Sequence, residues 1–120
     1  MIETRVFDHT AITALFRGNT TAFEIWLAAD AGELTLIFPA VAVAEANTII
    51  GGDSNAWRAI LDPGQVVVTP LDESTAIDVG TTVGSLAVRQ VVREAVQTEG
   101  KIVTEAPWQY PPGSPPIGHL

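Results

Sequence analysis

The apolar positions of this chain form four short runs typical of strands, separated by longer stretches with helical spacing. The short runs are residues 4–7, 34–38, 66–69 and 101–104. They are rich in Val, Ile, Phe and Thr, the residues that favour strands. The run at 34–38 is nearly continuous in apolar character, which is typical of a strand buried on both faces of a parallel sheet.

The intervals between these runs carry apolar residues at three- and four-residue spacings, and each interval holds a pair of expected helices. The expected helices are residues 10–16, 20–29, 40–50, 54–61, 72–80 and 85–99. Glycine, asparagine or proline stands at most of the breaks between them. Strands separated by helical pairs require a parallel sheet with helices on its faces. The pattern therefore predicts a three-layer α/β/α sandwich with a central four- to five-stranded parallel sheet.

The length of 120 residues suits a single domain. Residues 1–110 are expected to form it. Residues 111–120 contain four prolines and two glycines, a composition that predicts an irregular or disordered tail.

Composition narrows the possible chemistry. There is no cysteine, so a disulfide framework, a thiolate metal site and a cysteine nucleophile are excluded. The net charge of −8 disfavours passive nucleic-acid binding, because the chain repels phosphate groups. This argument does not apply to a nuclease that holds a divalent cation. The longest apolar stretch, residues 34–44, is too short to span a membrane. The first residues lack the apolar segment of a secretory signal, so a cytoplasmic location is expected.

Three acidic residues have contexts that suggest chemistry, and each also has a structural alternative. Asp8 follows the first strand and could cap the next helix. Glu45 lies among small apolar residues in the helix at 40–50, where a carboxylate is costly unless it is paired, bound to a metal or able to reach solvent. Glu105 follows the fourth strand and could be a plain surface acid.

Strand ends of a parallel sheet meet at one edge, where ligands of such sheets bind. Carboxylates gathered there repel one another, and a hard divalent cation relieves that repulsion. Asp8, Glu45 and Glu105 are therefore expected to hold Mg²⁺ or Mn²⁺. Thr10 and Thr104 stand beside Asp8 and Glu105 in the chain and could orient these carboxylates.

The chain resembles the PIN domain family over residues 4 to about 110. The resemblance rests on the order and spacing of five segments. These are Val6-Phe7-Asp8-His9-Thr10, Phe38-Pro39-Ala40 with Ala44-Glu45-Ala46, Val66 to Leu71, Leu86 to Ala95, and Gly100 to Thr104. PIN domains are metal-dependent ribonucleases with a parallel sheet flanked by helices, and many are the toxins of VapBC toxin–antitoxin pairs.

The resemblance implies that Asp8 and Glu45 correspond to the first two acids of the family's metal site. The third acid falls on Val88 and the fourth on Ala106, and Glu105 is offset from the fourth position by one residue. Neither valine nor alanine can bind a metal ion, so the site is partly degenerate.

The expected function is that of a Mg²⁺- or Mn²⁺-dependent endoribonuclease, the toxin of a toxin–antitoxin pair. Water activated by the ion would attack a phosphodiester of an RNA substrate. The alternative is a catalytically degenerate PIN domain acting as a dimeric protein- or RNA-binding module. A homodimer and a cognate antitoxin with a basic segment are the expected partners. Arg89 and Arg93 could bind a phosphate or simply share a solvated helix face.

Overall fold

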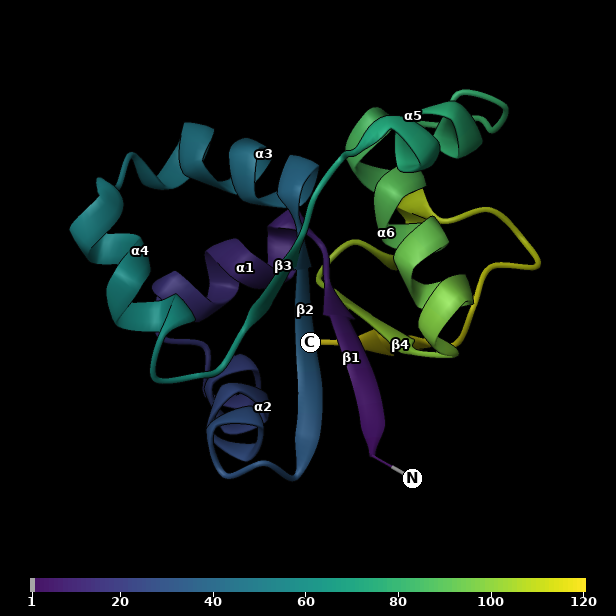
Figure 1. The fold of residues 1–120 in the computed structure, drawn as a ribbon. Coiled ribbons are helices and arrows are strands. Elements are labelled where there is room, and N and C mark those ends of the chain that lie inside the picture. Colours follow the sequence, from purple (N-terminus) through teal and green to yellow (C-terminus); the bar gives the residue numbers. More distant parts are fainter. Residues whose placement is uncertain (1) are drawn as a thin grey trace.

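Five strands form one sheet in the computed structural model, which describes residues 2–120 (Figure 1). The strands are β1 (Glu3–Phe7), β2 (Leu34–Pro39), β3 (Val67–Thr69), β4 (Lys101–Thr104) and β5 (Ile117–His119). The α-helices are α1 (His9–Phe16), α2 (Thr20–Asp30), α3 (Ala40–Ile50), α4 (Ser54–Leu61), α5 (Glu73–Val79) and α6 (Leu86–Thr98). A 3-10 turn, η1 (Pro107–Gln109), follows β4.

All neighbouring strands are parallel, in the order β3-β2-β1-β4-β5. The carboxyl ends of the strands therefore share one edge, with β1 at its centre. Helices α1 to α4 lie on one side of the sheet, and α5 and α6 lie on the other (Figure 1). The predicted α/β sandwich with a parallel sheet is confirmed.

The helices begin where the sequence provides a capping side chain. The N-cap residues Asp8, Asn19, Asp53, Asp72 and Ser85 each accept a hydrogen bond from a backbone N–H in the first turn. Helix α3 ends at Gly51, whose φ of +66° is the left-handed conformation that glycine adopts without strain. Within residues 2–120, no helix is both long and apolar enough to cross a bilayer.

The centre of the core is built on β1. Val6 pairs with Ile37 of β2 and Ile102 of β4, and all three side chains are buried. The rings of Phe7 and Phe38 stack with centroids 5.6 Å apart. Burying one such side chain stabilises the fold by about 1.5–3 kcal/mol. Because β1 is packed this tightly, Asp8, the residue after it, has a fixed place at the edge of the sheet.

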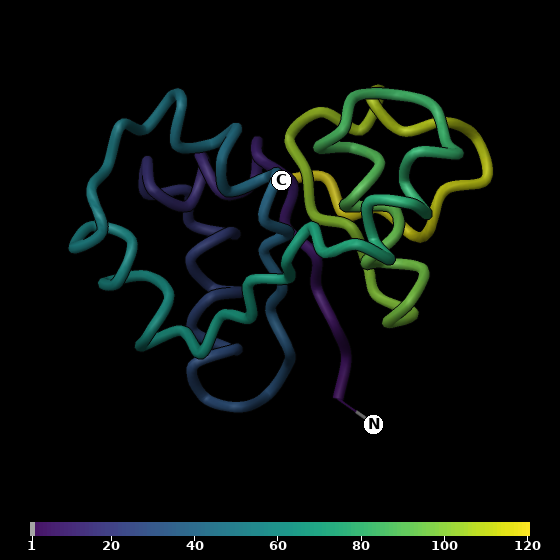
Figure 2. The backbone as a smooth tube through the Cα atoms, turned by 45° about the horizontal axis from the view of Figure 1, so that its top comes forward, coloured from purple at the N-terminus to yellow at the C-terminus, as the bar shows by residue number. Residues whose placement is uncertain are grey.

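The C-terminal segment differs from the irregular tail expected from its composition. It runs around the α6 side of the molecule and then returns to the sheet as β5 (Figure 2). Ile102 donates its N–H to the carbonyl of Pro116 at 2.9 Å, and Leu120 donates to that of Thr104 at 2.9 Å. Proline lacks an N–H and is disfavoured in a paired strand. However, the last four residues contain no proline and are free to add an edge strand.

Candidate functional site

Asp8 lies at the carboxyl end of β1 with its side chain only 1 % exposed. Its Oδ1 accepts hydrogen bonds from the backbone N–H of Ala11 at 3.0 Å and from the hydroxyl of Thr10 at 2.6 Å. Asp8 therefore has the capping role that was the structural alternative to metal binding. The carboxylate faces the positive end of the α1 dipole, where a negative charge is stabilised.

The second carboxylate oxygen of Asp8 is bound by a tyrosine. Tyr110, which follows η1, donates its hydroxyl to Oδ2 of Asp8 at 2.9 Å, and its ring is buried in the main core. Burial raises the pKa of Tyr110 far above its ordinary value of 10.0, and the negative charge of Asp8 raises it further. Tyr110 therefore remains a hydrogen-bond donor to Asp8 throughout the physiological range.

Two threonines connect α1 to the end of β4. The hydroxyls of Thr10 and Thr104 lie 3.2 Å apart, within hydrogen-bonding distance. Thr10 also accepts from the backbone N–H of Glu105 at 2.9 Å, and Thr104 accepts from that of Ala106 at 2.9 Å. Thr10 orients the Asp8 carboxylate, as expected from the sequence. Thr104 instead fixes the backbone turn that leads into η1.

The other two predicted ligands lie on the surface. Glu45 is exposed on α3, and Glu105 is exposed after β4. Glu105 lines a shallow pocket of about 160 Å³ together with His9, Arg17 and other α1 residues. Neither Glu45 nor Glu105 makes a side-chain hydrogen bond or ion pair with the rest of residues 2–120.

The three predicted ligands have different surroundings, because Asp8 is buried whereas Glu45 and Glu105 are exposed. Oδ1 of Asp8 accepts two hydrogen bonds and Oδ2 accepts one, so a metal could reach only the second lone pair of Oδ2, beside the hydroxyl of Tyr110 and in a residue that is 1 % exposed. Val88 and Ala106, at the positions where the resemblance expects acids, are both buried. Across the described part of the chain, no three Asp, Glu or His side chains come close enough to share a cation.

A glutamine joins three elements beside the carboxyl edge. Gln90, in α6, is fully buried. Its Oε1 accepts from the N–H of Val41 in α3 at 2.9 Å, and its Nε2 donates to the carbonyls of Thr69 and Pro70 at 3.2 and 3.3 Å. The side chain therefore satisfies backbone groups at the start of α3 and at the end of β3.

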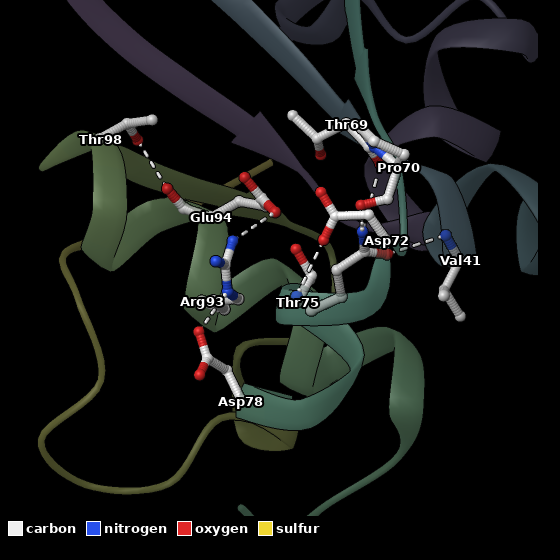
Figure 3. Close-up of polar contacts among 10 residues, drawn as sticks. Val41, Thr69, Pro70, Asp72, Thr75, Asp78, Arg93, Glu94 and Thr98 are labelled. Carbon is white, nitrogen blue, oxygen red and sulfur yellow. Dashed lines mark hydrogen bonds and ion pairs between the residues drawn. The ribbon is translucent and has the colours of Figure 1, made fainter. Parts of the chain in front are cut away.

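Glu94 lies one turn further along α6 and is also buried. Its carboxylate pairs with Arg93 at 3.3 Å, and Arg93 also pairs with Asp78 of α5 at 3.1 Å (Figure 3). Burial raises the pKa of Glu94 above its ordinary value of 4.5, the charge of Arg93 opposes this rise, and the charge of Asp72 adds slightly to it.

The raised pKa predicts a pH-dependent loss of stability. As pH rises above about 4.5, the unfolded chain releases the Glu94 proton before the folded chain does, so the free energy of unfolding falls through this window. Glu94→Gln removes this titration. We expect the variant to gain stability relative to the wild type as pH rises from 4.5 toward neutrality, measured by urea unfolding at several pH values.

Glu24→Gln, at an exposed position on α2, is the matched control for the loss of one carboxylate from a helix surface. If the free energies of unfolding of Glu94→Gln and the wild type differed by the same amount at every pH in this range, the pKa of Glu94 would not be raised.

No protein-family model matches the chain, and no curated protein matches it.

Tyr110 and Gln90 are the two site residues that sequence reasoning missed. Tyr110 is the only tyrosine of the chain and lies directly before a proline-rich segment, and no role was predicted for it from the sequence. Its amphipathic ring was the available signal, because a buried tyrosine hydroxyl needs a polar partner. Gln90 falls at a position of α6 flanked by Val91 and Arg89 and gives no signal of burial.

Proposed function

We propose that this chain is a PIN-like domain that binds another protein and does not cleave RNA. The family assignment is supported by the parallel sheet flanked by helices and by the segments that carry the resemblance. Asp8 at the end of β1 and Thr104 at the end of β4 are joined through Thr10, which agrees with their expected place at one edge of the sheet.

The contact between Tyr110 and Asp8 is the single observation that carries the non-cleaving proposal. A catalytic metal carboxylate needs an oxygen lone pair that is directed toward the ion and accessible to it and its water, whereas Asp8 is only 1 % exposed. Here Oδ2 of Asp8 accepts the Tyr110 hydroxyl at 2.9 Å in a buried setting. Val88 and Ala106 support the same proposal, because buried apolar side chains stand where the family has acids. Asp8 then serves to hold α1 and the C-terminal segment together.

A protein is the favoured partner because of charge and exposed apolar surface. A net charge of −8 repels phosphate backbones, whereas it attracts a basic polypeptide such as the expected antitoxin. Large apolar side chains are also exposed, including Phe23 and Leu27 one helical turn apart on α2. Such side chains are typical of protein contact surfaces. A basic protein partner, and a homodimer of the domain, are therefore proposed.

The alternative function is a metal-dependent endoribonuclease with Asp8, Glu45 and Glu105 around Mg²⁺ or Mn²⁺. One experiment distinguishes it from the proposed binding domain. Purified protein is mixed with RNA and Mn²⁺, and Mn²⁺ binding is measured by titration calorimetry. We expect no cleavage and no binding at millimolar ion. Glu45→Gln and the matched surface change Glu24→Gln should then behave as the wild type does, since both side chains are exposed. Mn²⁺-dependent cleavage that is lost in Glu45→Gln and kept in Glu24→Gln would overturn the proposal in favour of the nuclease.

A further inference from the structure

A groove of about 370 Å³ lies beside α5 and α6, outside the candidate site at the strand ends. Its apolar lining consists of Val79, Val83, Val88, Val92, Val96 and Pro111. Three of these valines recur every four residues along α6, so they form one stripe on the helix. Val83 is 82 % exposed and Val96 is 58 % exposed, which leaves much of this apolar surface open to water.

Arg89 lines the same groove and lacks a carboxylate partner. Its Nη1 donates to the carbonyl of Val79 at 3.0 Å, but its Nε–H is buried with no hydrogen-bond partner among residues 2–120. None of the ion pairs in this part of the chain includes Arg89. The neighbouring Arg93 is neutralised by Asp78 and Glu94. A half-buried guanidinium that has an unused hydrogen-bond donor in an apolar groove destabilises the folded state unless an acceptor reaches it.

One wall of the groove is held in place by the turn after α5. The carbonyl of Val79 accepts from Arg89, from the hydroxyl of Thr82 at 2.9 Å and from the Thr82 backbone N–H at 3.2 Å. The turn and the arginine are thus fixed to one another. Concave, mostly apolar sites that are already formed and carry a few polar groups are typical of small-molecule binding.

We propose that this groove binds a small amphipathic carboxylate, such as a medium-chain aliphatic acid. The aliphatic chain lies along Val88, Val92 and Val96, and the carboxylate accepts hydrogen bonds from the guanidinium of Arg89. Carboxylates match the planar donor geometry of arginine. The Nε–H is shielded in the free protein, so the groove side chains shift slightly to admit the ligand. A single negative charge suits this groove, because Arg89 is the one guanidinium of its lining that forms no ion pair among residues 2–120. This inference does not depend on the proposed function.

The test uses decanoate as the probe. Binding is measured from the NMR chemical shifts of the valine methyl groups in the isotope-labelled full chain. We expect saturable shifts of the groove valines with decanoate, and binding that is about tenfold weaker with decanol, which lacks the charge. Arg89→Gln should weaken decanoate binding to the level of decanol. The matched variant Arg17→Gln, at an exposed arginine of the α1 C-cap, should leave it unchanged.

Val96→Glu provides a second test that does not depend on the folding of the Arg89 variant, because residue 96 is exposed. It places a negative charge on the stripe and should abolish decanoate binding. The proposal fails if no valine shift saturates at millimolar decanoate, if decanol binds as tightly as decanoate, or if both groove variants bind normally. It also fails if a second copy of the chain covers the groove, seen as shifts of the groove valines that depend on protein concentration in the absence of ligand; a dimer formed through another face leaves these valines unshifted.

Discussion

Replacing Gln90 with alanine is expected to lower the free energy of unfolding by about 3–5 kcal/mol. The change removes the acceptor of the Val41 N–H and the donor to the carbonyls of Thr69 and Pro70. It also leaves a cavity at a fully buried position of α6. The orphaned backbone groups lie where α3 begins and β3 ends, so the loss is expected to destabilise the junction of three elements. Urea unfolding followed by circular dichroism measures it.

Gln97→Ala is the matched control, because Gln97 is an exposed glutamine on the same helix. It should change stability by no more than about 0.5 kcal/mol. A loss below about 1 kcal/mol for Gln90→Ala would show that water or a rearranged side chain satisfies the three backbone groups.

The second large effect is expected for Asp8→Ala, which should lower the free energy of unfolding by about 2–4 kcal/mol. The helix α1 loses its cap, and the buried hydroxyl of Tyr110 loses its acceptor. Asp8→Asn should cost much less, because an asparagine oxygen can still cap Ala11 and its amide can donate to the tyrosine oxygen. Thermal and urea unfolding of the two variants measure the difference.

Asp53→Ala separates capping from the contact with Tyr110. Asp53 caps α4 through the N–H of Ala56 at 3.0 Å, but it is exposed and has no tyrosine partner. Asp53→Ala should lower the free energy of unfolding by about 1 kcal/mol. Equal losses for Asp8→Ala and Asp53→Ala would mean that the contact between Asp8 and Tyr110 contributes nothing to stability.

The fold was predictable because its signals are local and repeated. Strand runs such as residues 34–38 are bounded by glycine and proline, and the helices between them carry clear spacing and caps. β5 was missed because its pairing is non-local and depends on three residues that follow a proline-rich stretch. The prediction of a tail used the composition of residues 111–120 as a whole, although the last four of these residues contain no proline.

The candidate site was only partly predictable. Asp8 follows an apolar strand, which correctly placed it at the sheet edge, and capping of the next helix was one of the two roles that the sequence left open. The exposure of Glu45 could not be inferred, because α3 is rich in small apolar residues all around and its buried face, which includes Ala42 and Ala46, is not distinct in the sequence. The partner of Asp8 is Tyr110, 102 positions later, and no local pattern encodes such a contact.

The central claim is that Asp8 is engaged by Tyr110, and the titration of this tyrosine tests it most directly. Tyr110 is the only tyrosine, so the rise in near-ultraviolet absorbance on forming tyrosinate reports this one side chain. We predict that the pKa of Tyr110 lies well above its ordinary value of 10.0 while the chain stays folded, and that the midpoint is lower in Asp8→Asn, which lacks the negative charge. A reversible midpoint near 10, unchanged by Asp8→Asn, would place Tyr110 in water and contradict the account.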